Sequence, residues 1–318
     1  QATELGRVEE GHPAHAEALR TGGEPQVLDG AGARPQVGVG EGRPAQDPGR
    51  RRAPVAAHDD PERGLPQALE LEVQQLPGSV RLQLSGLVEA GADILELGFP
   101  FSDPMAEGPP IQRASQRALK AGMTVKGTLD VVRAFRRGDQ ETPLILMGSL
   151  KPLLSYGLDR FAEDASAAGA DGMIVVDCPP EEAGPLHKAL KNHGVALIRL
   201  AAPTTDAARL PAVVKDTAGF VYYVSVAGVT GAKEADAEAV APAVQRLRDA
   251  SGLPVAVGFG INTPDRAAEV ARVADAAVVG SALVNVIAAA IEANEDPVPK
   301  VVETARALAQ AVRFARRG

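Results

Sequence analysis

Short runs of aliphatic residues recur along the chain from about residue 85 onward, and an amphipathic, alanine-rich stretch follows each run. The runs are apolar at consecutive positions, which is typical of strands buried on both faces of a parallel sheet. The stretches between them repeat their apolar residues with a helical period. This alternation predicts seven strands, at residues 93–99, 143–149, 172–178, 196–202, 220–225, 254–260 and 276–282.

Helical patterns separate these strands, at residues 124–137, 157–168, 180–192, 207–215, 237–250, 264–273 and 299–317. Seven units without a reversal favour a closed α/β barrel, the (β/α)8 or TIM barrel, over an open doubly wound sheet, provided that an eighth strand exists. That strand should precede the helix that ends at Ala90. Only residues 69–76 and 79–84 are available there, and neither is as rich in aliphatic residues as the other seven. We therefore expect a TIM barrel whose first strand is missing or replaced.

The first 84 residues differ in composition from the rest of the chain. They contain 12 Gly, 9 Pro and 16 Val or Leu, without an aromatic residue, Ile or Met. Burial of so few large side chains cannot offset the conformational entropy of ordering a segment of this length. All nine basic residues are Arg, a bias expected when GC-rich DNA is read out of frame. The composition predicts a disordered or out-of-frame segment at 1–84 and a TIM-barrel catalytic domain at 85–318.

Charge and cysteine content exclude several classes of function. The net charge of −8 argues against a protein that binds nucleic acid by neutralising phosphates. Cys178 is the single cysteine, so an intrachain disulfide or a multi-thiolate metal site is excluded, and a cytoplasmic location is expected. The most apolar stretch, residues 278–291, is too short to span a bilayer. The histidines form no metal-ligand spacing.

Two acidic positions are candidates for proton transfer. In a TIM barrel the reacting groups lie at the carboxyl ends of the strands and in the loops that follow. Glu96 is embedded in an apolar strand, where burial favours the protonated carboxyl group of a general acid or base. It could equally pair with an internal cation to join layers of the barrel. The proline-rich loop at 98–112 contains two more acids, Asp103 and Glu107. Such a stiff loop could hold a second carboxylate over the barrel mouth, or its Pro and Asp residues could simply favour a turn.

Glycines follow three successive strands in the last third of the barrel. Gly258 and Gly260 end one strand, Gly280 and Ser281 end the next, and Gly231 belongs to a loop after the preceding one. Backbone N–H groups at such glycines, together with a helix N-terminus, are suited to bind a phosphate. A dinucleotide fingerprint is excluded, because the third glycine and the downstream acid are absent. The pattern therefore predicts a phosphorylated substrate.

The chain resembles the tryptophan synthase α chain family. The resemblance covers the chain from about residue 85 onward and is most specific at residues 91–112, 174–182, 220–231 and 254–261. It implies a (β/α)8 barrel that cleaves indole-3-glycerol phosphate to indole and glyceraldehyde 3-phosphate in tryptophan biosynthesis. It also implies an α2β2 complex with a β chain that carries pyridoxal phosphate, while the α chain itself binds no cofactor or metal.

The resemblance assigns roles to individual positions. Glu96 matches the catalytic glutamate that shuttles protons at indole C3 and the glycerol hydroxyl. Glu107 matches a second catalytic acid, normally Asp, that takes or stabilises the indole N–H proton. Thr230 matches a loop threonine that helps to order this acid. The remaining matches are the phosphate-binding positions Gly231, Gly260, Gly280 and Ser281, the pocket positions Ile111, Tyr222 and Phe259, and the partner-interface positions Pro100 and Asp103.

Three departures from the family pattern keep other interpretations open. Glu replaces Asp at position 107, Ser149 and Lys151 stand where the family usually has Tyr and Asn, and the usual first strand is not found in residues 1–84. A displacement of about 1 Å in a catalytic group can cost about a hundredfold in rate. A second hypothesis is therefore an impaired copy that at most docks on the β chain. A third hypothesis is another phosphosugar enzyme with a barrel fold. The sequence around Glu96 argues against it.

Overall fold

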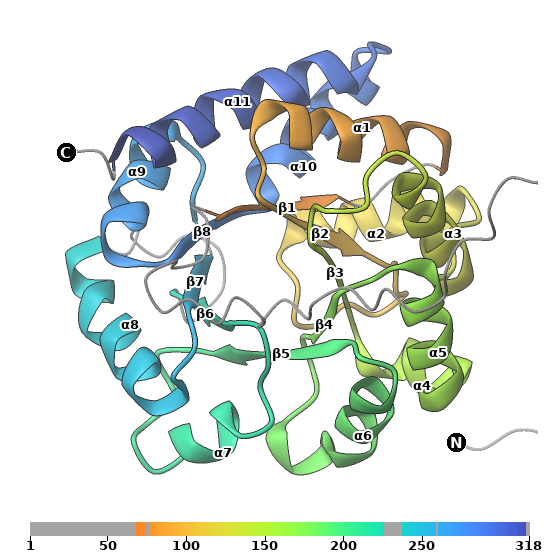
Figure 1. The fold of residues 1–318 in the computed structure, drawn as a ribbon. Helices are drawn as coiled ribbons and strands as arrows, with labels where there is room; N and C mark the ends of the chain where they lie inside the picture. The colour runs from red at the N-terminus through yellow and green to blue at the C-terminus, as the bar shows by residue number, and fades with distance from the viewer. Residues whose placement is uncertain (1–67, 74–76, 226–236, 259, 316–318) are drawn as a thin grey trace, which may run out of the picture. The chain divides into compact units, whose positions relative to one another are not determined.

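Eight parallel strands close into a barrel in the computed structural model, which describes residues 68–73, 77–225, 237–258 and 260–315 (Figure 1). Each strand pairs with the next along the chain, and the first pairs with the last. The strands are β1 Ala68–Val73, β2 Ile94–Gly98, β3 Leu144–Gly148, β4 Gly172–Val175, β5 Ala196–Ala201, β6 Val221–Val224, β7 Val255–Gly258 and β8 Ala276–Val279.

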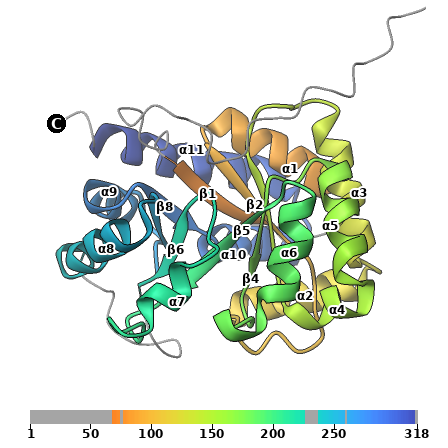
Figure 2. The same cartoon turned by 60° about the horizontal axis from the view of Figure 1, so that its bottom comes forward.

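Helices surround the strands and cover the outer face of the sheet (Figure 1). Figure 2 shows α3, α5 and α6 side by side, with α8 and α9 on another side of the barrel. The helices are α1 Pro77–Ala90, α2 Pro109–Lys120, α3 Val125–Arg136, α4 Leu150–Tyr156, α5 Leu158–Ala168, a short 3-10 helix η1 Pro180–Glu182, α6 Gly184–Asn192, α7 Leu210–Val214, α8 Ala237–Ser251, α9 Pro264–Val273, α10 Ser281–Glu292 and α11 Pro297–Ala315.

The first strand, which we expected to be missing or replaced, is present in the structure as β1. β1 begins at Ala68, one residue before the first of the two ranges available for it. It closes the barrel, pairing with β2 through Leu71 and Leu95 and with β8 through Leu71 and Val279. Its sequence, ALELEV, includes two glutamates and is poor in aromatic and β-branched residues. Strand propensity depends strongly on context, and a strand with hydrogen-bonding neighbours on both sides can form where its composition alone predicts none. β1 and part of α1 therefore precede the boundary predicted at residue 85.

Buried side chains form two layers that follow the alternation of side chains along the strands. Inward positions fill the barrel interior, among them Ile94, Ile145, Ile174, Ile198 and Phe220. Outward positions such as Leu95 and Leu197 pack against the helices in the larger cluster. Because the strands from β2 to β8 are buried on both faces, their sequences are apolar runs, interrupted by a charged residue only at Glu96 in β2 and Arg199 in β5. This is why the strands were visible in the sequence.

An aspartate before the strand is paired with an arginine from a helix at three places in the barrel. Asp171 accepts from Arg136 Nη2 at 2.6 Å and from the backbone N–H of Leu144 at 2.8 Å. Asp275 is held in the same way by Arg248 and by the backbone N–H of Val255, each at 2.8 Å. The pairs, which precede the amino ends of β2, β4 and β8, are Asp93–Arg313, Asp171–Arg136 and Asp275–Arg248. They tie the helices to the barrel at the amino ends of the strands.

Element boundaries differ from the prediction at the carboxyl ends of the strands. The strand expected at 172–178 ends at Val175, and the one expected at 276–282 ends at Val279, because α10 begins at Ser281. The loop expected at 98–112 is shorter, since α2 begins at Pro109, where proline is favoured in the first turn of a helix. None of the described helices is both long and apolar enough to cross a membrane.

Candidate active site

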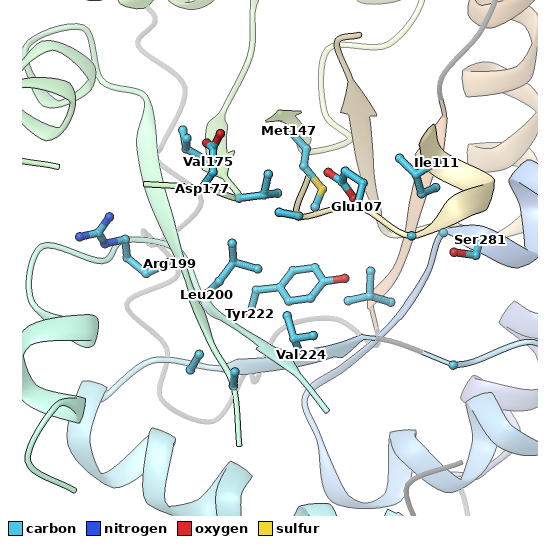
Figure 3. A pocket seen from close by; sticks show the side chains of 18 of the residues that line it. Glu107, Ile111, Met147, Val175, Asp177, Arg199, Leu200, Tyr222, Val224 and Ser281 are labelled. Carbon is cyan, nitrogen blue, oxygen red and sulfur yellow. The ribbon is translucent and has the colours of Figure 1, made fainter. Parts of the chain in front are cut away.

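A cavity of about 740 Å³ opens at the carboxyl ends of the strands (Figure 3). Side chains from the barrel interior form its base, among them Met147 on β3, Tyr222 on β6 and Val278 on β8. Residues from the loops that follow the strands form its walls. The cavity therefore lies where TIM barrels carry their active sites.

Glu107 lines one wall of this cavity. Its loop is fixed to α2 by the side chains of two residues in that helix. The Phe101 N–H donates to Ser115 Oγ, and the Ser115 hydroxyl donates to the Phe101 carbonyl, both at 2.9 Å. Gln112 Nε2 donates to the backbone carbonyl of Glu107 at 2.9 Å. The loop is thus attached to α2 at Phe101 and at Glu107. These contacts fix the backbone from which the Glu107 side chain extends.

Burial raises the pKa of Glu107 to about 7, and the nearby negative charge of Asp177 contributes to the rise. Both causes act against the ionised carboxylate, since a low-dielectric surrounding and a like charge each favour the neutral form. An acid with a pKa near neutrality can accept or deliver a proton at physiological pH. Glu107 is therefore suited to proton transfer, which Asp103 on the same loop, being exposed, is not positioned to perform.

Asp177 was not singled out from the sequence, although it lies in the matching segment 174–182. It lines the cavity two residues after the end of β4. Its Oδ1 accepts from the backbone N–H of Leu150, the first residue of α4, at 2.7 Å. The signal that could have revealed it is an acid placed directly after a strand of a barrel, the same rule that identifies Glu107.

Glu96 lies in the barrel interior rather than on the cavity wall. Its side chain is 1% exposed, and its Cα pairs with that of Ile145 on β3. Met147, two residues farther along β3, lines the cavity. The carboxyl group of Glu96 therefore belongs to the layer beneath the described part of the cavity, where proton transfer would be shielded from water.

Another part of the cavity wall presents glycines and a helix N-terminus. Gly260 has φ +78°, a conformation that favours glycine, and the space where a Cβ would lie is open. Gly280 precedes α10, and both Gly280 and Ser281 line the cavity. The first N–H groups of this 12-residue helix have no partner within the helix and can bind an anion. Asn262 and Asn285, also missed in the sequence, add neutral amide groups to this wall.

The middle of the cavity is apolar and aromatic. The ring of Tyr222 lies across from Ile111 and Glu107 (Figure 3). Gly258 makes this position possible, because a Cβ there would lie 2.7 Å from Cζ of Tyr222 and the ring would have to move. Apolar and aromatic surfaces facing each other across a gap can hold a flat aromatic ring.

Arg199 is a buried cation that the sequence analysis did not identify. It is 7% exposed on β5, and its Nη1 donates to the Cys178 carbonyl at 3.5 Å. Figure 3 shows its side chain directed away from Glu107. Burial raises the pKa of the Cys178 thiol, and Arg199 partly offsets this effect. Arg199 thus connects β5 to the loop that follows β4.

The remaining sequence-based candidates are distributed as follows. Thr230, Gly231 and Phe259 lie outside the described residues. Pro100 is buried, whereas Asp103 is exposed. Ser149 is 4% exposed immediately before α4. Lys151 is exposed on α4. In the ranges that the structure describes, His, Cys, Asp and Glu side chains form no cluster of three able to hold a metal ion.

Comparison with known proteins agrees with this geometry. The sequence profile of the tryptophan synthase alpha chain matches residues 77–313. The chain belongs to this family. The α chain of Caulobacter vibrioides (strain NA1000 / CB15N) is 69% identical over 235 residues, which are 74% of this chain and 86% of that protein. The α chain of Acidiphilium cryptum is 54% identical over 238 residues, again 74% of this chain and 86% of the relative.

Solved structures of family members have the same fold. Tryptophan synthase subunit alpha from Legionella pneumophila strain Paris superposes with a TM-score of 0.73 at 42% identity, covering 78% of this chain and 93% of that chain. A chain from the α2β2 complex of Pyrococcus furiosus superposes with a TM-score of 0.69 at 33% identity, covering 76% and 97%. The (β/α)8 barrel is therefore the fold of the family as well as of this chain.

Proposed function

We propose that this family member catalyses the α reaction of tryptophan synthase, the lyase cleavage of indole-3-glycerol phosphate to indole and glyceraldehyde 3-phosphate. The observation that carries the proposal is the combination of groups that line one cavity. They are an acid with a pKa near 7, apolar and aromatic side chains, and a glycine-lined helix N-terminus. A substrate with an indole, a hydroxylated chain and a phosphate presents matching chemistry.

The reaction requires proton transfers and one carbon–carbon cleavage. In the proposed sequence, Glu96 delivers a proton to indole C3 while Glu107 stabilises the N–H that becomes acidic. The deprotonated Glu96 then takes the proton of the adjacent glycerol hydroxyl. The C–C bond breaks as the carbonyl of glyceraldehyde 3-phosphate forms, and its electron pair restores the aromatic indole. Protons and electrons balance within substrate and enzyme.

Placement of Glu96 supports this role. Glu96 is 1% exposed in the barrel interior, and its Cα pairs with that of Glu72 on β1 and with that of Ile145 on β3. A buried acid transfers a proton without competition from solvent. Glu107 is held at the cavity wall by its anchored loop. The two acids thus occupy different environments, which suits one for delivery and the other for acceptance of a proton.

Substrate phosphate is assigned to the wall formed by Gly260, Gly280 and Ser281. Gly260 leaves open space beside its backbone. The N-terminus of α10 supplies free N–H groups and the positive end of the helix dipole. Gly231 is proposed as a further phosphate position, and Thr230 and Phe259 as further pocket positions, on the basis of the family pattern. Tyr222 and Ile111 are proposed to enclose the indole ring.

Assembly with a β chain is proposed from the family as well, since the Pyrococcus furiosus neighbour is described as part of an α2β2 complex. The exposed loop after β2 is a candidate contact, because Asp103 and the 90% exposed Met105 both lie on it. Pro100 is buried and would support this loop from beneath. The α chain brings no cofactor of its own in this proposal, and pyridoxal phosphate belongs to the partner. A cytoplasmic location and a catalytic barrel that begins at β1 complete the proposal.

An impaired copy that only docks on the β chain is the alternative. Glu107, one methylene longer than the usual Asp, is the observation that favours it. The first strand does not favour this alternative, because β1 closes the barrel.

A direct assay separates the two. The full chain is incubated with indole-3-glycerol phosphate, with and without a β chain, and indole and glyceraldehyde 3-phosphate are quantified. Stoichiometric formation of both products supports the proposed function. A chain that binds the β chain and forms neither product would instead be the impaired copy.

A further inference from the structure

The cavity at the carboxyl ends of the strands is not confined to the barrel interior. Tyr222 in its lining belongs to the cluster inside the barrel. Three other lining residues, Val175, Ala201 and Val213, belong to the cluster between the strands and the helices. The cavity therefore continues past β4 and β5 toward η1 and α7. We call this part the outer lobe, which is lined by Val175, Cys178, Arg199, Ala201, Arg209 and Val213.

Arg199 brings a positive charge into the outer lobe. Side chains alternate between the two faces of a strand, and the neighbouring Leu200 packs inside the barrel, so Arg199 points to the outer face of β5. Figure 3 shows the two side chains on opposite sides of this strand. Arg199 is 7% exposed. A cation is therefore largely withdrawn from water in a part of the cavity whose other walls include apolar side chains.

The guanidinium of Arg199 lacks an acidic partner among the described residues. Its Nε is buried and has no hydrogen-bond partner there. Its Nη1 donates to the Cys178 carbonyl at 3.5 Å, which is long for a hydrogen bond. A neutral carbonyl does not compensate a buried positive charge as a carboxylate would, and a buried charge without its counter-ion is costly. The outer lobe thus presents a cation that an anionic ligand would stabilise.

The acids nearby do not provide this counter-ion. Glu181 pairs with Arg209 at 3.1 Å, and both side chains are exposed. A backbone hydrogen bond and Arg209 lower the pKa of Glu181, and the charge of Arg199 contributes less than that of Arg209. Asp177 accepts from the Leu150 N–H at 2.7 Å. These acids leave Arg199 without an ion pair, but their charges disfavour a ligand that carries more than one negative charge.

We propose that the outer lobe binds a small monocarboxylate with an apolar body, whose carboxylate pairs with Arg199. The planar guanidinium matches the two oxygens of a carboxylate. The buried side chains of Val175, Ala201 and Val213 provide the apolar surface for the rest of the ligand. A single negative charge neutralises Arg199, whereas a phosphate dianion would leave an excess of negative charge beside Glu181. This binding site is separate from the α reaction proposed above and does not depend on it.

Cys178 reports whether the outer lobe is occupied. It is the single cysteine of the chain, it is partly exposed, and it lines the lobe. The rate at which iodoacetamide alkylates Cys178 is measured in the full chain, at constant ionic strength, as hexanoate is added. Hexanamide is the neutral analogue of the same length. Hexanoate should slow alkylation along a saturation curve, and hexanamide should bind at least about tenfold more weakly, because a charge-assisted hydrogen bond is lost.

Two variants test the role of the guanidinium. Arg199→Gln removes the charge and keeps an N–H donor for the Cys178 carbonyl. Arg272→Gln is the matched control, because Arg272 is an exposed arginine on α9 that does not line the cavity. Each variant is compared with its own rate without ligand, since burial raises the pKa of the Cys178 thiol and Arg199 partly offsets this effect. The affinity for hexanoate should fall at least about tenfold in Arg199→Gln and stay unchanged in Arg272→Gln.

Several results would overturn the proposal. Hexanoate might leave the alkylation rate of the parent chain unchanged, or hexanamide could protect Cys178 equally well; neither comparison requires a variant to fold. Full protection by hexanoate in Arg199→Gln would exclude the guanidinium as the receptor, and an equal loss in Arg272→Gln would assign the effect to net charge. Stronger protection by inorganic phosphate than by hexanoate would exclude a monocarboxylate as the ligand.

Discussion

Replacement of Glu107 by glutamine should make the stability of the barrel less dependent on pH. The pKa of Glu107 is raised to about 7 from an ordinary value of 4.5. Between these values the folded chain binds more protons at this position than the unfolded chain does. The free energy of unfolding therefore falls as the pH rises through this window, because the slope has the sign of the protons bound by the unfolded minus the folded state. Glutamine cannot ionise, so Glu107→Gln removes this decrease in the free energy of unfolding.

The magnitude follows from the shift. Raising a pKa from 4.5 to about 7 corresponds to about 3 kcal/mol in full, at about 1.4 kcal/mol for each unit. About 2.5 kcal/mol of this falls between pH 5 and pH 8 when both titration curves are integrated. Glu107→Gln should thus gain stability relative to the parent chain by about that amount over this range. Contributions from other groups cancel in the difference between the two proteins.

Urea unfolding of both proteins at pH 5, 6, 7 and 8 measures the difference, provided that each transition is two-state. Asp103→Asn is the matched control, because Asp103 is an exposed acid on the same loop that does not line the cavity. A difference for Glu107→Gln that does not change with pH would refute the reasoning, since it would show that the Glu107 carboxyl group ionises as easily in the folded chain as in the unfolded one.

Three further substitutions test separate parts of the account. Gly258→Ala should cost about 1–3 kcal/mol of stability and weaken the affinity for an indole analogue, because the new Cβ would displace the ring of Tyr222; unchanged values of both would show that the ring moves freely. Asp171→Ala should cost about 3–5 kcal/mol in urea unfolding, because the 6% exposed guanidinium of Arg136 loses its carboxylate partner at 2.6 Å and keeps only that of Asp139 at 3.9 Å. A cost below about 1 kcal/mol would show that the Asp171–Arg136 pair contributes no more than an ion pair on the surface. Glu107→Asp should raise the rate of indole formation with the β chain present, since the anchored loop cannot retreat from the longer side chain; an equal or lower rate would show that the barrel is fitted to glutamate.

Most of the fold could be predicted from the sequence, because strands buried on both faces leave continuous apolar runs. The first strand could not, because the two glutamates of ALELEV lower its apolar density and its hydrogen bonds come from distant neighbours on both sides. The helix α2 was hidden for a different reason. Its first residues, Pro109 and Pro110, continue a proline-rich loop and look like part of it.

The sequence predicts those residues of the candidate site whose type and position after a strand suggest their chemistry without knowledge of their neighbours. Glu107, Gly260 and Ser281 do line one cavity in the structure. Asp177 and Arg199 were missed, because their importance depends on what lies beside them in space. Asp177 accepts from the N–H of Leu150, and Arg199 donates to the Cys178 carbonyl. In each pair the two residues belong to different βα units of the barrel. Sequence spacing does not report such contacts.

Glu96→Gln offers the most direct test of the central claim that proton transfer by Glu96, with Glu107 assisting, cleaves indole-3-glycerol phosphate. The substitution preserves the size of a side chain that is 1% exposed and removes its ability to exchange a proton. The single measurement is the rate of indole release by the variant and the parent, each saturated with indole-3-glycerol phosphate and β chain. The account predicts that the parent releases indole and that the variant loses at least about a hundredfold in rate. Retention of most of the parent rate by Glu96→Gln would contradict it and make Glu96 a structural acid.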